Sequence, residues 1–453
     1  MRAVRSDDFV FPRNFKEEKP LAVRAEGAYI FDEQGKRYID GCSGALISSI
    51  GHGVSEVTDA ISAQLKTLSF AHPSRWRNMA VEEAAEEIAE ITPGDLNHVW
   101  FVSGGSEAIE SAVKMARQFF LERDGSASPR HLVIARWNSY HGSTLGTMAI
   151  GGSMPRRRFF SPMFKEHPKI ETHYCYRCPY GLEYPGCGVR CAHDLEREIK
   201  RIGAQYVAAF MAEPVVGSTV GALNPPDEYW PIIREICDRY DVLLIADEVM
   251  TGFGRTGKAF AVDHWNVVPD IIAAAKAMAA GYIPTGGIFV SERIVDTFRK
   301  GSGAFMHGHT YNGNPISGAA TAATVRYMKK HRLFDNAALM GDLLASGMEE
   351  LPASVPIVGQ VRGLGLMRGV ELVADRQSRT PFPKSAKAAA AVTSECMKRG
   401  LIVYPGGGMV DGVDGDNFMV APPLNITEEQ VKEIMSILQE SLMAASAALA
   451  KPL

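Results

Sequence analysis

The sequence lacks any long apolar run, and this absence limits where the protein resides. No stretch of about 18 consecutive apolar residues, the length that a membrane-crossing helix needs, occurs in the chain. The first residues, Met1 to Asp8, include arginine and aspartate and lack the apolar segment of a secretory signal. We therefore expect a cytoplasmic protein without a membrane partner.

An excess of charge of one sign is also missing. The 48 basic and 52 acidic residues give a net charge of −4 and are spread through the chain. Proteins that bind nucleic acid concentrate basic side chains in a patch, so we expect no nucleic-acid partner. The one dense basic run, Arg156 to Arg158, is typical of a solvated loop.

Cysteine is scarce, with 7 residues in 453, and the odd number favours a reducing compartment over a disulfide framework. Four of them form the pattern C-x2-C, eight residues, C-x3-C: Cys175, Cys178, Cys187 and Cys191. Four thiolates at such spacing can hold zinc. The aromatic and proline residues between them also indicate a packed loop, and we favour this interpretation, with no metal.

What the sequence does contain is typical of a globular α/β protein. Hydrophobic residues make up 46% of the chain and charged residues 22%. Apolar segments that we expect to be buried strands are each followed by a polar motif, at 99–102, 132–135, 207–212 and 242–246. Helical periodicity is found at 54–68, 81–91, 315–330 and 386–399, a hairpin is expected within 21–40, and a capping box begins at Thr427. Helices between strands indicate a doubly wound α/β fold.

The segment from Val242 to Lys276 has the features of a site. An apolar strand ends in Asp247, and a second apolar segment leads to Lys276. In open α/β sheets, ligands bind outside the carboxyl ends of the strands. Apolar surroundings disfavour the charged ammonium form of a lysine held there, so its free amine can attack a carbonyl to form a Schiff base. The alternative is a surface lysine, because the alanine-rich segment 273–280 has high helix propensity.

Two further motifs favour a phosphorylated, planar ligand. The glycine turn at 103–107 leads into a helix, whose first N–H groups and positive dipole end suit a phosphate. Tyr140 follows the strand at 132–135, and its ring either stacks on a heterocycle or fills the core. The turn lacks the glycine pattern of dinucleotide-binding proteins, so a Rossmann dehydrogenase is disfavoured.

The stretch Leu244 to Val249, with Gly252-Phe253-Gly254-Arg255-Thr256-Gly257, Pro269-Asp270-Ile271 and Lys276 before Gly281-Tyr282, resembles the signature of class III aminotransferases of the ω-amine and ω-amino-acid type. These are pyridoxal-phosphate (PLP) enzymes of fold type I. The resemblance implies an α/β fold with a large domain, whose mostly parallel central sheet is flanked by helices, and a small α+β domain built from both termini. We expect 1–70 to form the first part of the small domain and the opening of the active site, 71–330 the large PLP-binding domain, and 331–453 the rest of the small domain.

The resemblance also implies roles for individual residues. Lys276 carries pyridoxal 5'-phosphate as a Schiff base and moves the proton, and Asp247 pairs with the pyridine nitrogen. The remaining cofactor contacts are Gly105 and Ser106 at the phosphate, Tyr140 and Val249 on the two ring faces, and His141 and Glu213 beside them. Thr310 reaches the phosphate of a neighbouring subunit, which implies a homodimer or a dimer of dimers with shared active sites.

The implied function is transfer of an amino group from a primary amine, polyamine or ω-amino acid to a 2-oxo acid, pyruvate foremost, in two ping-pong half-reactions. An aminomutase, racemase or decarboxylase of the same fold, or a catalytically silent homologue, are the alternatives. Many members of the family bind the acceptor carboxylate with an arginine shortly before a Pro-Pro motif, but 406–417 contains none. Asp411 and Asp414 in that loop favour a cationic donor, unless both are solvated. Leu46 and Trp76 are further candidates for substrate contact.

Overall fold

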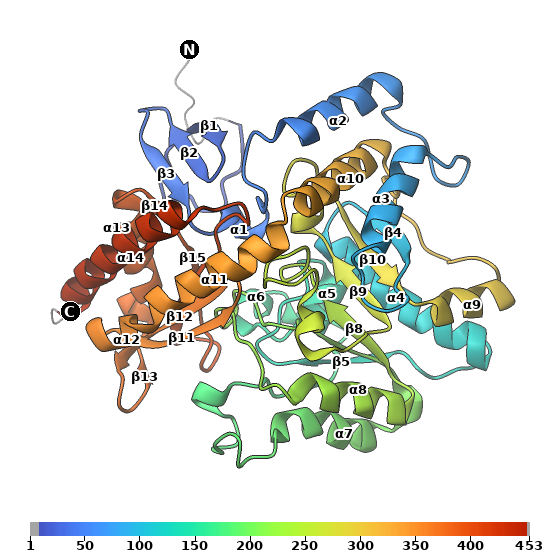
Figure 1. Ribbon diagram of the computed structural model, residues 1–453. Helices are drawn as coiled ribbons and strands as arrows, with labels where there is room; N and C mark the ends of the chain where they lie inside the picture. The colour runs from blue at the N-terminus through green and yellow to red at the C-terminus, as the bar shows by residue number, and fades with distance from the viewer. Residues whose placement is uncertain (1–8, 451–453) are drawn as a thin grey trace.

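We describe residues 9–450 of the chain from a computed structural model (Figure 1). Met1 to Asp8, on which the expected absence of a secretory signal rests, lie outside the described residues. Within the described part, no helix has both the length and the apolar character needed to cross a membrane.

A seven-stranded sheet forms the centre of the larger part of the molecule. Its strands run in the order β4-β10-β9-β8-β7-β5-β6. β10 is antiparallel to both of its neighbours, and the other pairings are parallel, so the expected mostly parallel sheet is confirmed. The strands are β4 (His98–Val102), β5 (Leu132–Arg136), β6 (Lys169–Ile170), β7 (Val207–Ala212), β8 (Leu243–Asp247), β9 (Ile271–Ala274) and β10 (Gly286–Val290).

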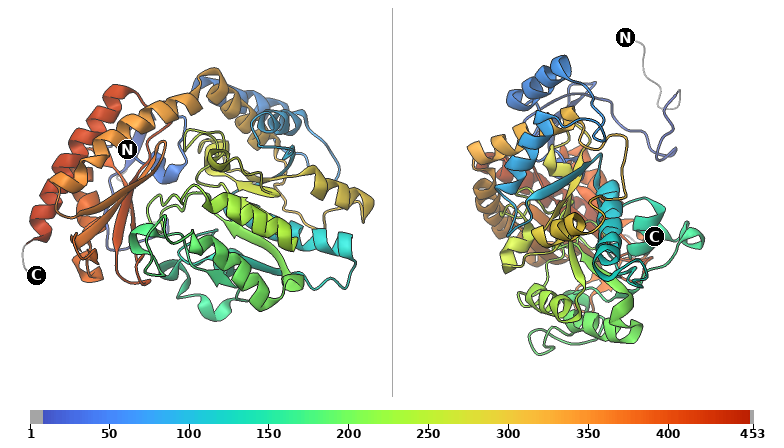
Figure 2. Two further views of the ribbon diagram at one scale, coloured as in Figure 1. Left: turned by 60° about the horizontal axis from the view of Figure 1, so that its bottom comes forward. Right: turned by 90° about the vertical axis from the view of Figure 1, so that its right-hand side faces the viewer.

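Helices cover both faces of this sheet, because side chains of buried strands alternate between the faces. On β8, Leu243 and Ile245 pack in one cluster with α4 (Gly105–Asp124), whereas Leu244 packs in another with α7 (Arg190–Ile202) and α8 (Tyr229–Tyr240). Figure 2 shows α7 and α8 stacked on one side of the sheet. Every residue of β7, β8 and β9 is buried, which explains their continuous apolar sequences.

Five parallel strands end at the same edge of the sheet, and each is followed by one of the motifs. β4 leads to the turn before α4, β5 to Tyr140, β7 to Glu213, β8 beyond Asp247 to Val249, and β9 to Lys276. Segments that lie up to about 170 residues apart in sequence therefore meet at one place. The parallel topology, rather than any single motif, assembles the site.

The smaller part of the molecule combines the two ends of the chain (Figure 1). β1 (Ala22–Glu26), β2 (Tyr29–Asp32) and β3 (Arg37–Asp40) form a sheet with β14 (Leu401–Ile402), which pairs with β3. A second sheet contains β11 (Val358–Leu364), β12 (Met367–Asp375), β13 (Thr380–Pro381), β15 (Tyr404–Gly407) and β16 (Asp416–Val420). The expected α+β unit of both termini is thus present, and its boundaries at 70 and 330 stay a prediction.

The predicted helices are found with small shifts at their ends. They are α2 (Ser55–Thr67), α3 (Met79–Ala89), α10 (Pro315–Lys330), α13 (Ala388–Lys398) and α14 (Glu428–Leu449). The capping box is confirmed, since the Thr427 hydroxyl accepts the Gln430 N–H and the Gln430 side chain accepts the Thr427 N–H. The other helices are α1 (Ser43–Leu46), α5 (Leu145–Ile150), α6 (Met154–Arg157), α9 (Glu292–Lys300), α11 (Leu333–Glu349) and α12 (Leu351–Ser354).

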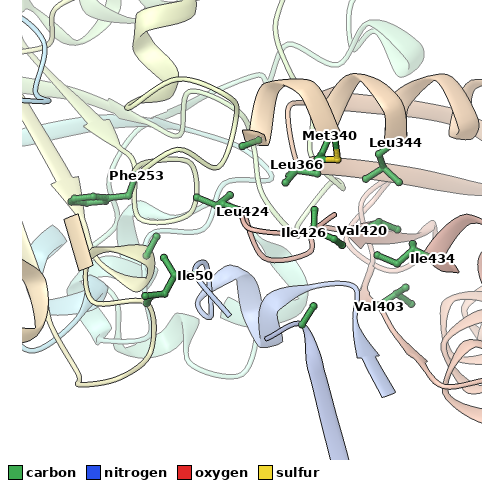
Figure 3. Packing of buried hydrophobic residues seen from close by; sticks show 14 of the residues in the cluster. Ile50, Phe253, Met340, Leu344, Leu366, Val403, Val420, Leu424, Ile426 and Ile434 are labelled. Atoms are coloured by element: carbon green, nitrogen blue, oxygen red, sulfur yellow. The ribbon is translucent and has the colours of Figure 1, made fainter. Parts of the chain in front are cut away.

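The largest hydrophobic cluster joins the two parts of the molecule (Figure 3). Phe253, which follows the signature strand, and Ile50 near the N-terminus lie in it with Leu366, Leu424 and Ile434 of the C-terminal region. All five side chains are fully or almost fully buried. A continuous core of this kind restricts how the two parts move relative to each other.

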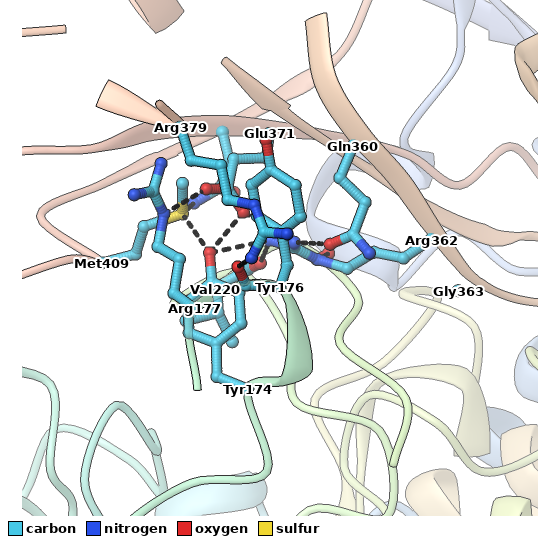
Figure 4. A network of polar contacts seen from close by, with 12 residues as sticks. Tyr174, Tyr176, Arg177, Val220, Gln360, Arg362, Gly363, Glu371, Arg379 and Met409 are labelled. Atoms are coloured by element: carbon cyan, nitrogen blue, oxygen red, sulfur yellow. Dashed lines mark hydrogen bonds and ion pairs between the residues drawn. The ribbon is translucent and has the colours of Figure 1, made fainter. Parts of the chain in front are cut away.

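A buried polar network attaches the cysteine-rich segment to the sheet of the smaller part (Figure 4). Glu371 on β12 is fully buried and accepts hydrogen bonds from Arg177 Nε at 2.6 Å, Arg362 Nη1 at 2.7 Å and the Tyr174 hydroxyl. Arg362 also donates to the backbone carbonyls of Val220 and Gly221. The two cations balance the buried carboxylate and join three separate segments.

Candidate active site

A cavity of about 370 Å³ opens at the carboxyl edge of the parallel strands. Residues from five different strand ends line it, among them Ser106, Tyr140, Glu213, Asp247, Val249 and Lys276. The sequence placed these residues in separate motifs, and the fold brings them together. His141 and Gly105, which were predicted with them, also line the cavity.

Lys276 stands directly after β9, and its surroundings change its acidity. Burial lowers the pKa of its amine to about 8, helped by the positive charge of Arg156 and opposed by Asp247 and Glu213. Its backbone φ is 44°, in the left-handed region that a non-glycine residue rarely adopts. Strain of this kind is concentrated at functional positions.

The surface-lysine alternative for Lys276 is wrong. Ile271–Ala274 is a strand that pairs with β8 and β10, and only a 3-10 turn, Lys276–Met278, follows it. The helix propensity of alanine is weak compared with burial between two strands, so tertiary packing decides the conformation here.

Asp247 forms a buried polar group with His141 and Glu213. Its Oδ2 lies 2.7 Å from His141 Nδ1, and its Oδ1 accepts the Val249 N–H at 3.1 Å. His141 Nε2 lies 4.0 Å from Glu213 Oε2 and has no hydrogen-bond partner in the described part of the chain. Burial acts to lower the pKa of His141, but Glu213 and Asp247 together outweigh it, so the pKa is raised. The His141 imidazole thus holds the Asp247 carboxylate in place.

Arg136 completes this group, and sequence reasoning missed it. The guanidinium at the end of β5 is fully buried, and its Nη2 donates to the Glu213 carbonyl at 2.5 Å and lies 3.4 Å from Glu213 Oε2. Glu213 Oε1 in turn accepts the Tyr140 N–H at 3.0 Å. A charged residue at the end of an otherwise apolar strand was the signal available in the sequence.

The N-terminus of α4 forms a concave wall of the cavity at Gly105 and Ser106. A Cβ on Gly105 would lie 2.9 Å from Val249 Cγ1, so a larger residue would crowd the cavity. Ser106 Oγ accepts the Ser143 N–H at 3.0 Å, and Gly142, with φ of 130°, allows this close approach because a Cβ would lie 2.6 Å from that oxygen. Helix N–H groups without intrahelical partners therefore face space suited to an anion.

Several candidates for substrate contact do not line this cavity. Leu46 is fully buried in the core cluster of α7 and α8, and its neighbour Ile47 lines the cavity instead. Trp76 is 69% exposed and does not line the cavity, and neither does the exposed Thr310, which was expected at the phosphate of a neighbouring subunit. Asp411 accepts the backbone N–H groups of Val413 and Asp414. The Asp414 carboxylate accepts the Lys384 N–H at 2.9 Å.

The four clustered cysteines lie around one small cavity of about 20 Å³. All are free thiols, and burial together with the neighbouring thiols raises the pKa of Cys175 and Cys191. Within residues 9–450, no three or more His, Cys, Asp or Glu side chains are arranged to hold a metal ion. The zinc alternative gains no support from this arrangement, and the absence of a metal stays an expectation.

An amine, a carboxylate and a helix N-terminus gathered at the carboxyl edge of a mostly parallel sheet define a PLP enzyme of fold type I. The chain belongs to the class III aminotransferases, because the profile of that family, Aminotransferase class-III, matches residues 12–442. It is therefore an aminotransferase that depends on PLP.

Individual proteins agree with this assignment. The chain is 40% identical over 432 residues to the uncharacterized aminotransferase YodT of Bacillus subtilis, with 95% of this chain and 97% of that one covered. It is 34% identical to the putrescine–pyruvate aminotransferase of Pseudomonas aeruginosa, with 94% and 91% covered. A PLP-bound crystal structure of an amine transaminase from an uncultivated Pseudomonas species superposes with a TM-score of 0.88, at 33% identity and 99% coverage of both chains.

The residues present fit PLP. The cavity offers an amine, a buried carboxylate and a helix N-terminus, which match the aldehyde, the pyridine nitrogen and the phosphate of the cofactor. Tyr140 and Val249 both line the cavity and supply an aromatic and an aliphatic surface for a planar ring.

Proposed function

We propose that the protein transfers the amino group of a primary amine, polyamine or ω-amino acid to a 2-oxo acid, with pyruvate as the preferred acceptor. The observation that carries this proposal is the pair of Lys276 and Asp247, which end adjacent parallel strands and line one cavity. A putrescine–pyruvate aminotransferase among the relatives supports an amine donor and this acceptor.

We infer the following roles for the residues of the cavity. Lys276 holds the cofactor covalently, and Asp247, held by His141, pairs with the pyridine nitrogen. The N-terminus of α4 at Gly105 and Ser106 binds the phosphate, and Glu213 holds Tyr140 through its backbone N–H. When bound, PLP supplies an electron sink that stabilises negative charge on the substrate carbon.

The lysine also moves the proton in this proposal. A pKa of about 8 leaves an appreciable fraction of Lys276 as free amine near neutral pH, so Nζ can take a proton from the substrate carbon and return it. The amine and the carboxylate thus have separate roles, since Asp247 holds the cofactor ring while Nζ moves the proton.

The decisive experiment is a half-reaction with donor alone. We expect putrescine or another amine of a donor panel to convert the bound cofactor to its amine form, seen as a change in absorbance, and pyruvate to reverse it. Lys276→Ala should fold, as judged by its melting temperature. However, borohydride should trap no covalently bound cofactor on this variant, and the variant should show no turnover. A racemase, aminomutase or decarboxylase would give product without this lasting spectral change, and a silent homologue would give neither.

We also propose that the active unit is a homodimer with shared active sites. Exposed apolar side chains gather near the segment that carries Thr310, with Met306 81% exposed and Tyr311 61% exposed. Light scattering should report a dimer or a dimer of dimers, and Met306→Glu should shift it towards monomer and weaken PLP retention. A monomeric wild type that retains PLP and full activity would contradict the shared site.

A further inference from the structure

We propose that Arg156 and Ser218 bind the carboxylate of the 2-oxo acid acceptor. This inference rests on the proposed transaminase function and deepens it, because it names the group that selects a carboxylate-bearing acceptor. It also gives a function to Arg156, the first residue of the basic run at 156–158, which the sequence alone indicated to be a solvated loop.

Arg156 does not itself line the cavity, but it contacts two residues that do. Its Cζ lies 4.4 Å from the centroid of the Tyr140 ring, and its Nη2 donates to Ser218 Oγ at 3.1 Å. Tyr140 and Ser218 both line the cavity, and Ser218 is 6% exposed. The guanidinium is therefore fixed in orientation by stacking and one hydrogen bond, while most of its five N–H donors stay available.

No carboxylate neutralises Arg156. In the described part of the chain, no Asp or Glu oxygen lies within 4.0 Å of its guanidinium nitrogens. Its neighbour Arg157 differs, because it is buried and paired with Glu166 at 2.5 Å. Glu213, an acid of the cavity wall, is engaged by Arg136 and by the Tyr140 N–H. A half-buried arginine without an acidic partner beside a cavity is available for an anion from solution.

The charges of the cavity show why such a cation is needed. Among the residues that line it, Lys276 is the one with a basic amine, and Asp247 and Glu213 are acids. Lys276 is already assigned to the cofactor, and Glu213 and Asp247 are engaged by Arg136 and His141, so Arg156 is the cation beside the cavity that remains available to a substrate carboxylate. Arg156 is close enough to lower the pKa of Lys276. In a 2-oxo acid, the carboxylate is bonded directly to the reacting carbon, and its anchor must lie near the amine.

The test compares acceptors that differ in the carboxylate. The PLP-loaded enzyme, converted with a reactive donor, is mixed with pyruvate or with acetaldehyde, which lacks the carboxylate. At a pH well above 8, where Lys276 is unprotonated with or without the Arg156 charge, we expect Arg156→Gln to lower kcat/KM for pyruvate about 10- to 100-fold, the value of hydrogen bonds to a charged group. The value of kcat/KM for acetaldehyde should change by less than about twofold. Arg158→Gln is the matched control, because Arg158 stacks on exposed Phe159 and should change neither acceptor.

A second readout is independent of turnover. Binding of propanoate and of uncharged propanamide to the PLP-loaded enzyme is measured by ligand-observed NMR, and Arg156→Gln should weaken propanoate at least about tenfold without affecting propanamide. Arg156→Lys keeps the charge but loses the planar, two-pronged guanidinium, so its affinity for propanoate should lie between those of wild type and Arg156→Gln. If Arg156→Gln does not fold, the Lys variant carries the test.

Equal losses for pyruvate and acetaldehyde, or unchanged propanoate binding, would overturn the proposal, because a residue that only positions Tyr140 affects both acceptors alike. Failure of the transaminase function itself looks different. In that case wild type gives no half-reaction with any donor, while the propanoate measurement still decides whether Arg156 binds a carboxylate.

Discussion

Asp247 Oδ2 lies 2.7 Å from Nδ1 of His141, and the two side chains are 3% and 2% exposed. The Asp247 carboxylate accepts hydrogen bonds from His141 and from the Val249 N–H, which fix its orientation. A buried carboxylate that keeps its charge is what a pyridinium nitrogen requires as a partner. This pair is therefore the electrostatic centre of the proposed site.

Asp247→Asn should retain the cofactor but react slowly, because an amide cannot balance a protonated ring nitrogen. We expect the donor half-reaction to slow by roughly 100-fold or more, in stopped-flow absorbance measurements. Glu248→Gln is the control, since the Glu248 side chain accepts the Thr251 hydroxyl and the Val262 N–H and does not line the cavity. A half-reaction of wild-type speed in Asp247→Asn would remove this carboxylate from the mechanism.

The reactivity of Lys276 should depend on pH with a midpoint near its pKa of about 8. The folded-state pKa lies below that of an ordinary lysine, so the reactive amine increases as pH rises through 8, and about a tenth is unprotonated at pH 7. The rate of PLP attachment to cofactor-free protein, trapped with borohydride, measures this titration.

Two variants test the cause of that shift. Arg156→Gln should move the midpoint to higher pH, because the Arg156 charge lowers the pKa of Lys276, and Asp247→Asn should move it lower. An unchanged midpoint in both variants, or a lower midpoint in Arg156→Gln and a higher one in Asp247→Asn, would show that the two charges do not act on this amine as stated.

Glu371→Ala should destabilise the protein strongly. It would leave Arg362 and Arg177 without their buried partner, at a cost of about 3–5 kcal/mol in the free energy of unfolding. Glu26→Ala is the control, because Glu26 pairs with Arg24 at the surface and should cost under about 1 kcal/mol. Urea unfolding compares the two, and a similar small loss in both would mean that the network adds little.

The carboxylates of Asp411 and Asp414 should not affect the preference of the enzyme for a cationic donor. Asp411 and Asp414 accept backbone N–H groups of loop segments and do not line the cavity. We expect the Asp411→Asn, Asp414→Asn double variant to keep the wild-type ratio of kcat/KM for putrescine over 4-aminobutyrate. A ratio that falls about fivefold or more would support the cationic-donor hypothesis drawn from the sequence.

The sequence by itself determined the parts of this protein that follow from local chemistry and one topological rule. Apolar strands that each end in a functional residue predicted the parallel sheet, and the carboxyl ends of parallel strands meet at one edge. The proximity of Asp247, Lys276 and the turn before α4 could therefore be predicted without information on long-range contacts. The capping box at Thr427 was equally local, because its hydrogen bonds span three residues.

Only the tertiary structure decided where loop side chains point. Leu46 was expected in the pocket, but its φ of 60° and the kink within 43–46 turn it into the core and leave Ile47 at the cavity. The sequence does not distinguish Arg156 from the other arginines of the basic run. Only the structure shows that its guanidinium stacks on Tyr140. The direction of a loop side chain depends on backbone angles and on contacts with residues distant in sequence, and neither periodicity nor motif spacing encodes these. The position of a residue at a strand end, in contrast, is fixed by the strand's place in the parallel sheet.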